Sequence, residues 1–352
     1  MQRRSFLAGS VAMMGMGTAQ AAPSGMIVPA EDVKHACTFM QWPVSRDAYP
    51  GRGQLRKTQA TIAEIANTIA DFEPVIMLAD AQYHEAIRSQ LSSKVELWNV
   101  PTDDLWCRDS GPLFLSNGRG KLAVSHIQFN GWGDRASYQH DGRVAERVAD
   151  RLGLDLIPSG LRGEPGGVEQ DGHGLLIAHA SSWVNPNRNP GLSQAEIGQR
   201  LCRAYGADRI VWSDGVAGQD VTDYHIDGLA RFTKRNEVLI NLPQRPKRSD
   251  DFHMAALDTY DALVAAGIKV NEIADPQRTR VKRWDFVAAY VNYYVCNGGV
   301  LASHFGDPGT DQAAANALAR HYPGREVVML NTDALGKLGG GIHCATQQMP
   351  AT

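Results

Sequence analysis

A cysteine that follows three glycines near the C-terminus has the surroundings of a nucleophile. It is Cys344, in the segment Gly339-Gly340-Gly341-Ile-His-Cys. A glycine run lets a ligand approach closely, and a nearby cation or histidine can hold a thiol as the reactive thiolate. The alternative is a flexible glycine tail with an idle cysteine.

A histidine and a carboxylate stand two residues apart in Asp223-Tyr-His-Ile-Asp-Gly. They are His225 and Asp227. In an extended chain, residues i and i+2 point to the same face, so the spacing predicts that both side chains project together. The carboxylate could tune the histidine for acid and base chemistry, or both could hold a substrate cation. A surface His-Asp pair is the alternative.

A third candidate, Asp109, lies in Trp106-Cys-Arg-Asp-Ser-Gly-Pro. We expect an extended segment to end there, which would place Asp109 at a strand end beside a turn. On this pattern alone, Asp109 could either cap the turn or take part in the chemistry. The neighbouring Arg108 is expected to form a structural ion pair.

A fourth candidate, Glu164, precedes the pair Gly166-Gly167, where the chain or a ligand could approach closely. The segment reads as a hairpin with its turn at Asp171-Gly172. Asp171 and His173 are then explained as turn residues, whereas Glu164 has no obvious turn role.

These residues need elements to position them, and the chain shows apolar strands alternating with amphipathic helices. Strand pairs interleaved with single helices suggest repeated modules. A capping box at Ser193-Gln-Ala-Glu196 should open a helix that runs to about Tyr205 and stops at Gly206. The other expected helices are 54–72, 81–91, 260–266 and 311–321; the expected strands are 74–78, 95–100 and 209–212, with strand pairs in 230–242 and 290–304.

The composition is that of a globular enzyme with a leader segment. The 352 residues are 43% apolar and 21% charged. Gln2-Arg3-Arg4-Ser-Phe-Leu, followed by a short apolar run ending at Ala21, predicts a twin-arginine export signal over 1–21 and a single catalytic domain over 22–352. We therefore expect a periplasmic or secreted protein without a membrane span after signal removal.

The charge and the cysteine pattern restrict the partners. Cleavage removes two arginines and no acid, so the net charge of -3 becomes -5, which disfavours nucleic acid. The five cysteines form no C-x-x-C pair, and no H-E-x-x-H motif occurs, so no metal is expected. An odd number of cysteines leaves at least one free in an oxidising compartment, and Cys344 is the candidate.

Together, the four segments resemble the agmatine deiminase and bacterial peptidylarginine deiminase family of the guanidine-modifying superfamily. Further matching motifs run in order along nearly the whole mature chain: Pro29-Ala-Glu31, Met40-Gln-Trp-Pro43, Phe129-Asn-Gly-Trp-Gly and Tyr290-Val-Asn-Tyr-Tyr. The resemblance implies a five-fold pseudosymmetric α/β propeller, the pentein fold, with the active site at its centre.

The resemblance also implies hydrolysis of a cationic guanidinium without a metal or organic cofactor, and it implies a role for each site residue. Asp109 and Asp227 would accept hydrogen bonds from the guanidinium nitrogens, and Cys344 would attack its carbon to form a thiouronium. His225 would protonate the departing ammonia and then activate water. Glu164 would orient His225 or bind the substrate.

Three residues beside the site depart from the family pattern and leave the substrate open. They are Pro165 in place of a glycine, Tyr224 before the histidine in place of a glycine, and Gly341 where agmatine deiminases often have Asn. We expect agmatine as substrate, with Trp106 available for its distal ammonium. Peptidyl or free arginine is the alternative. An amidino-transfer enzyme and a non-catalytic guanidinium-binding protein are two other classes.

Overall fold

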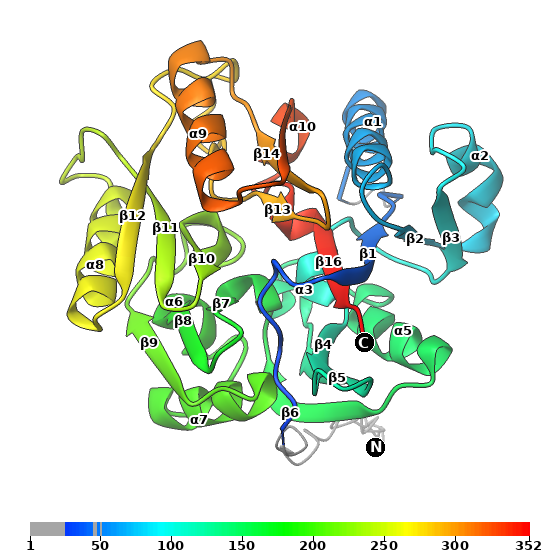
Figure 1. Cartoon of the computed structure of the whole chain (residues 1–352), viewed down its shortest axis with the longest axis horizontal. Helices are drawn as coiled ribbons and strands as arrows, with labels where there is room; N and C mark the ends of the chain where they lie inside the picture. The colour runs from blue at the N-terminus through cyan, green and yellow to red at the C-terminus, as the bar shows by residue number, and fades with distance from the viewer. Residues whose placement is uncertain (1–24, 45–47, 50) are drawn as a thin grey trace, which may run out of the picture.

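Five small sheets surround one central axis in the computed structural model, which describes residues 25–44, 48–49 and 51–352 (Figure 1). Four sheets have three strands and the fifth has four. The sheets contain, in turn, β16-β1-β2-β3, β4-β5-β6, β7-β8-β9, β10-β11-β12 and β13-β14-β15. The expected five-fold pseudosymmetric α/β propeller is confirmed.

Each sheet repeats one pattern. An inner strand pairs antiparallel with a middle strand, and the middle strand pairs parallel with an outer strand. A parallel pair needs a crossover, and one long helix supplies it in each module. The inner strands are β4 (Leu113–Ser116), β7 (Val168–Gln170), β10 (Ala230–Lys234), β13 (Tyr294–Val295) and β16 (Thr346–Pro350). The middle strands are β5 (Leu122–Gln128), β8 (Leu175–His179), β11 (Glu237–Leu242), β14 (Gly299–Ser303) and β1 (His35–Gln41).

The outer strands and the crossover helices complete the modules. The outer strands are β6 (Leu156–Arg162), β9 (Arg209–Ser213), β12 (Lys269–Ala274), β15 (Glu326–Leu330) and β2 (Val75–Ala79), which is extended by β3 (Val95–Asn99). The crossover helices, in the same order, are α5 (Val144–Leu152), α7 (Gln194–Tyr205), α8 (Asp251–Ala265), α9 (Pro308–His321) and α1 (Arg52–Ile69), and they lie at the periphery (Figure 1).

Short helices fill the connections. They are η1 (Ala81–Tyr83), α2 (His84–Arg88), α3 (Cys107–Ser110), α4 (Gly131–Asp134), η2 (Asp141–Arg143), η3 (Pro165–Gly167), α6 (Ala180–Trp183), η4 (Ile226–Gly228), α10 (Asp333–Gly336) and η5 (His343–Ala345).

The ring closes through the two ends of the chain. Strand β16 pairs antiparallel with β1, so that Thr38 faces Gln348, while β1 pairs parallel with β2 on its other side. One module is therefore assembled from residues about 300 positions apart. The segment that carries Cys344 reaches the axis only when this last strand is in place.

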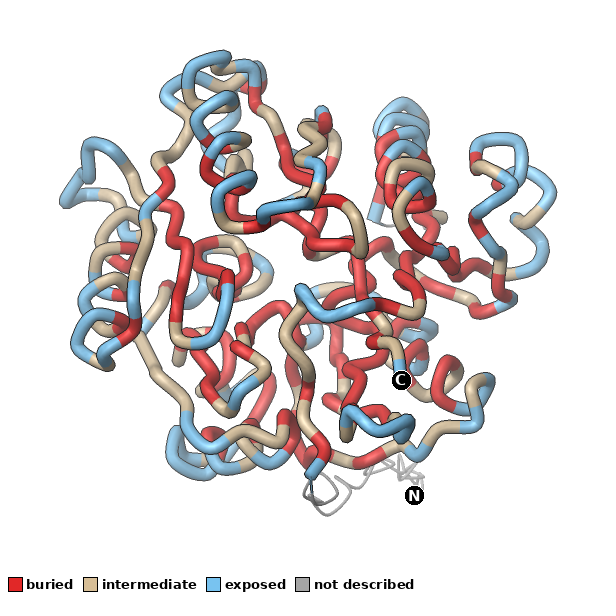
Figure 2. Tube along the Cα trace, viewed as in Figure 1, coloured by how far each residue is buried: buried red, intermediate tan, exposed pale blue. Residues whose placement is uncertain are grey.

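Apolar contacts hold each crossover helix on its sheet. Ile62, Ile65 and Ile69 of α1 are fully buried at helical spacing and belong to the same core cluster as Val75 and Met77 of β2. The inner strands are buried, whereas the outward faces of the helices are exposed (Figure 2). Burial of apolar area, at roughly 25 cal/mol per Å², is the main force that fixes the modules around the axis.

Most expected elements are confirmed, and two are wrong in extent. The hairpin at Asp171-Gly172 and the strand pair within 230–242 form as expected. The helix expected at 260–266 is the end of α8, which begins at Asp251. In 290–304 the first strand covers only Tyr294–Val295, because the chain forms a turn at Tyr290 and Val291. The predicted signal over 1–21 lies outside the described residues.

The capping box of α7 is confirmed. The Ser193 hydroxyl accepts from the Glu196 amide at 3.3 Å, and Glu196 accepts from the Ser193 amide at 2.8 Å. Gly206 ends the helix with φ of 65°.

Replacing Ser193 by alanine should lower the free energy of unfolding by about 1 kcal/mol, because an N-terminal amide of α7 loses its acceptor. Urea denaturation followed by circular dichroism measures this change. Ser93→Ala, at an exposed loop serine, is the control and should leave the free energy unchanged. An equal effect of both changes would contradict the role of the cap.

Candidate active site

Each of the five modules places a polar side chain at the axis, just ahead of its inner strand. Asp109 lies in α3 before β4, and Glu164 precedes η3 and β7. His225 and Asp227 lie at η4 before β10, and Cys344 lies in η5 before β16. Asn292 occupies the equivalent turn before β13. Residues spread over more than 200 positions thus converge through one repeated position in the fold.

A cleft of about 1050 Å³ opens onto these groups. Asp109, His225, Asp227, Asn292 and Cys344 all line it. The aromatic walls near this end are Trp106 and Trp132. Glu164 is not in the lining, because it lies behind His225.

Asp109 carries a buried oxygen without a partner. Its Oδ2 accepts a hydrogen bond from Trp132 Nε1 at 2.9 Å, whereas its Oδ1 has no hydrogen bond. Burial raises the pKa of Asp109 to about 6; the carboxylates of Glu164 and Asp227 add to the rise, and His225 opposes it. A buried acceptor without a donor is costly, so this oxygen is suited to a cationic donor that enters the cleft.

His225 lies between two carboxylates. Its Nε2 is 3.1 Å from Glu164 Oε2, and its Nδ1 is 3.7 Å from Asp109 Oδ1. Burial lowers the pKa of His225, but Asp109 and Glu164 outweigh burial and raise the pKa to about 9. The imidazole is therefore protonated at neutral pH and can act as an acid.

Glu164 is itself fixed by a buried arginine. Arg188 donates from Nε to both Glu164 oxygens at 3.0 and 2.9 Å, and its Nη1 donates to Asp223 at 2.7 Å. This pairing offsets the cost of burying the charge. Of the two roles left open for Glu164, its contacts fit orientation of His225.

Cys344 lies among hydrogen-bonding and acidic groups. Asn292 Nδ2 is 3.2 Å from the sulfur, and the thiol is 3.5 Å from Asp227 Oδ2. Burial raises the pKa of Cys344, and Asp227 and Asp109 raise it further. The free protein therefore holds Cys344 as a thiol. The expectation of a thiolate held by a protein cation is not met by these contacts.

The glycine after Pro165 lets the acidic groups converge. A Cβ atom built on Gly166 would lie 2.6 Å from Asp109 Oδ1, 2.9 Å from His225 Nδ1 and 3.3 Å from Asp227 Oδ2. Any side chain at Gly166 would displace these groups.

Two local predictions around the site are wrong, although the residues converge as expected. Asp109 lies in the short helix α3, not at a strand end, because the chain turns at Cys107. His225 is extended with φ of -61° and ψ of 140°, but Asp227 lies in the 3-10 turn η4. The turn brings both side chains to the axis without a strand.

Two structural expectations are confirmed. Arg108 pairs with Glu31, with Nη2 3.2 Å from Oε2. Asp171 closes its hairpin by accepting from the amides of His173 at 2.7 Å and Leu175 at 3.0 Å.

The structure explains two of the departures from the family pattern. Tyr224 has φ of 67°, a left-handed conformation that a glycine adopts at no steric cost. Its ring stacks on His179 with centroids 4.7 Å apart and packs edge-on against Phe252. At Gly341, a Cβ would lie 2.4 Å from Asn292 Oδ1, so a larger residue there would displace Asn292.

Asn292, Trp132 and Arg188 were missed as site residues. Asn292 and Trp132 lie in two of the matching motifs, Tyr290-Val-Asn-Tyr-Tyr and Phe129-Asn-Gly-Trp-Gly, to which the sequence alone assigns no role. The repeat could have identified Asn292, because it holds the position before an inner strand that the other candidates hold. Arg188 gives no comparable signal.

Three further observations concern the described part of the chain. All five cysteines lie in the described residues and are free thiols, so the absence of a disulfide does not distinguish Cys344 from the others. No group of three or more His, Cys, Asp or Glu among the described residues is arranged to hold a metal ion. None of the described helices has the length and apolar character needed to cross a membrane.

The chain is similar to known deiminases over nearly its whole length. The model of the Porphyromonas-type peptidyl-arginine deiminase family matches residues 27–350. Agmatine deiminase of Ectopseudomonas mendocina is 32% identical over 356 residues, which cover 93% of this chain and 96% of the relative. That of Stutzerimonas stutzeri is 31% identical with the same coverage. The solved agmatine deiminase of Enterococcus faecalis superposes with a TM-score of 0.84 at 25% identity, covering 93% of this chain and 96% of the other.

The His225 ring should titrate with a midpoint near 9, and Asp109→Asn should lower that midpoint because it removes a facing negative charge. NMR of the ring protons measures it. Since the folded pKa exceeds the ordinary value, the stability contributed by this charge is present below about pH 6.5 and is lost as the pH rises through about 9.

Asp285→Asn, at the exposed edge of the cleft, is the control for this titration and should leave the midpoint in place. A midpoint that is the same in wild type and Asp109→Asn would contradict the electrostatic account of the site.

Proposed function

This chain belongs to the Porphyromonas-type peptidyl-arginine deiminase family and is a hydrolase of C–N bonds, and we propose that it converts agmatine to N-carbamoylputrescine and ammonia. The observation that carries this choice is the charge of the cleft. Seven aspartates and two lysines line it, and no arginine is among its described lining residues. Agmatine has a cation at each end, whereas arginine has a carboxylate at the end distant from the guanidinium.

Two acids of the cleft lining, Asp275 and Asp250, fit the distal ammonium. Asp275 lies near Asp250, and burial together with the Asp250 charge raises the pKa of Asp275 to about 6. An ammonium between these acids would relieve their repulsion. Trp106 lies against Gly340 near the sulfur, where a Cβ on Gly340 would be 2.5 Å from its ring. Trp106 therefore fits the guanidinium end better than the distal ammonium assigned to it from the sequence.

Binding of the guanidinium prepares the nucleophile. The planar cation donates to Asp109 Oδ1 and to the Asp227 carboxylate, in charge-assisted hydrogen bonds. Its positive charge offsets the two carboxylates that raise the pKa of Cys344. The thiol then loses its proton to solvent in the cleft, so the reactive thiolate forms only when substrate is bound.

The first chemical step forms a covalent intermediate. The sulfur attacks the guanidinium carbon, and a C–S bond forms. Protonated His225 donates its Nδ1 proton, on the side that faces Asp109, to one NH₂ group. The C–N bond breaks, ammonia leaves, and a thiouronium remains on Cys344.

The second step hydrolyses the thiouronium and regenerates the free enzyme. His225, now neutral, takes a proton from a water molecule that attacks the same carbon. The C–S bond breaks, the sulfur leaves with its electron pair, and loss of a proton from the product gives the ureido group of N-carbamoylputrescine. Glu164 and Arg188 hold the imidazole in place through both steps.

A peptide that contains arginine is the second candidate, because the cleft is large and extends to Trp284, whose side chain is 92% exposed. A peptide backbone could lie along this wall. The acidic lining favours the smaller dication.

Ammonia release should be fastest with agmatine, when compared with free arginine and an arginine peptide, and Cys344→Ala should reduce it by at least about a thousandfold because the nucleophile is lost. Cys202→Ala, a partly buried cysteine of α7, is the control and should keep wild-type rates.

Other results would change the proposal. Release from the peptide alone would move the substrate to peptidylarginine. Transfer of the amidino group to an added amine would indicate an amidinotransferase. Tight agmatine binding without any turnover would indicate a binding protein.

We also propose that the chain is exported by the twin-arginine route to the periplasm or beyond. Support comes from Arg3-Arg4 followed by the short apolar run to Ala21. Cleavage there would leave the mature chain with the acidic net charge deduced above.

Changing both Arg3 and Arg4 to lysine should retain the full-length precursor in the cytoplasm, because the pair is the signal that the export machinery reads. Fractionation with immunoblotting measures it. Arg119→Lys, at an exposed turn between β4 and β5, should leave export unchanged. Normal export of the Arg3 and Arg4 double variant would contradict the twin-arginine assignment.

A further inference from the structure

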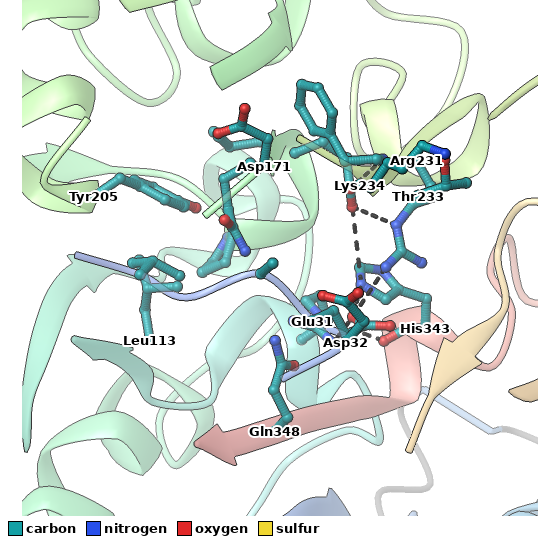
Figure 3. A pocket seen from close by; sticks show the side chains of 18 of the residues that line it. Glu31, Asp32, Leu113, Asp171, Tyr205, Arg231, Thr233, Lys234, His343 and Gln348 are labelled. Carbon is teal, nitrogen blue, oxygen red and sulfur yellow. Dashed lines mark hydrogen bonds and ion pairs between the residues drawn. The ribbon is translucent and has the colours of Figure 1, made fainter. Parts of the chain in front are cut away.

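A second group of buried charges lies behind Asp227, around a chamber of about 40 Å³ that is separate from the substrate cleft. We call His343, Glu31, Glu169, Arg231 and Arg108 the axial charge cluster. Figure 3 shows Glu31 close to both Arg231 and His343. The steps of the proposed reaction assign no role to these residues.

His343 connects this cluster to the substrate site. Its Nδ1 is 2.7 Å from Asp227 Oδ2, and its Nε2 is 3.0 Å from Glu31 Oε2. A carboxylate, which accepts hydrogen bonds, therefore faces each ring nitrogen, and the Nδ1 side is the one that meets Asp227. His343 is buried, so its orientation is set by these two bonds.

Glu31 anchors the far side of the imidazole. Its Oε2 forms ion pairs with Arg231 Nη2 at 2.9 Å and with Arg108 Nη2 at 3.2 Å. Its Oε1 accepts a hydrogen bond from the Val295 amide at 2.9 Å. Arg231 also pairs with Glu169 at 2.6 Å. Buried charges of this kind need mutual compensation. Two arginines and the His343 ring thus face the carboxylates of Glu31, Glu169 and Asp227.

The backbone of His343 supports the nucleophile as well. Its amide is 3.1 Å from Asn292 Oδ1. Asn292 Nδ2 in turn donates to the Cys344 sulfur and to the Asp227 carbonyl, each at 3.2 Å. His343 therefore contacts both the Asp227 carboxylate, which is to hold the cation, and the Asn292 side-chain amide, which lies beside the thiol.

We propose that His343 is a positioning residue that fixes the Asp227 carboxylate for the guanidinium, and that Glu31 anchors it from the opposite side of the ring. This inference rests on the proposed function, because it assumes that Asp227 holds the substrate cation. It predicts that loss of the His343 Nδ1 donor weakens recognition of a cation and leaves the intrinsic reactivity of the Cys344 thiol unchanged.

The test compares two alkylating reagents of nearly equal shape. Chloroacetamidine carries a planar cation and chloroacetamide is neutral, and both alkylate a thiol with loss of chloride. The preference is the ratio of their rates at Cys344, located by peptide mass spectrometry. The wild-type protein should prefer the amidine.

His343→Ala should reduce this preference by about tenfold or more, since a hydrogen bond to a charged group is worth ~1.5–3 kcal/mol. His343→Asn retains an N–H donor near the Nδ1 position and should keep most of the preference. Glu31→Gln should reduce it partially. His173→Ala, at an exposed turn histidine, is the matched control and should behave as wild type.

The outcomes separate the two proposals. No amidine preference in the wild type would overturn the cation-binding role of the acidic site, and with it the proposed function. A wild-type preference that persists in folded His343→Ala, as judged by circular dichroism, would overturn the positioning role. Equal loss in the Ala and Asn variants would overturn the assignment to the Nδ1 donor.

If His343→Ala does not fold, the Asn and Glu31→Gln variants decide. An unchanged preference in Glu31→Gln would overturn the role of Glu31 as the anchor of His343.

Discussion

Three carboxylates buried together at the axis, two of them beside the thiol, are the constraint on which this structure depends. Glu164 contacts Arg188 and His225, and Asp227 contacts His343. Asp109 has a hydrogen bond from Trp132 and a histidine 3.7 Å away, and its Oδ1 remains without a donor. Uncompensated charge is thus concentrated where a guanidinium would enter. Burial, together with the charges of Asp227 and Asp109, raises the pKa of Cys344 and keeps it protonated until a cation arrives, which links recognition to reactivity.

The propeller makes this crowding of acids possible. Each module supports its own residue on a short turn before a buried inner strand, and no module contains both the nucleophile and the histidine. Pairing of β16 with β1 brings Cys344 to the axis and also brings Glu31, which precedes β1, beneath His343. The two ends of the chain therefore complete both the site and its support.

The fold and most of the site could be predicted because their signals are local or carried by motifs. Cys344, His225, Asp227, Asp109 and Glu164 stand beside glycines and turns, outside the apolar periodic runs. Their convergence followed from the resemblance, since no local pattern places residue 109 beside residue 344.

Other features depend on contacts between distant segments, which a single sequence does not display. Arg188 gains its role only when Glu164 and Asp223 fold around it. The protonated state of Cys344 follows from its burial at the axis and from carboxylates on two other modules. The left-handed Tyr224 contradicts local preference and is held by packing against His179 and Phe252.

The central claim is that Cys344 bonds covalently to the substrate carbon. Mass spectrometry of protein quenched in acid during the first turnover of agmatine tests it most directly. The account predicts a species heavier than the free protein by agmatine less ammonia, with the added mass on Cys344. Turnover without such a species on a millisecond timescale, or an adduct on another residue, would contradict it.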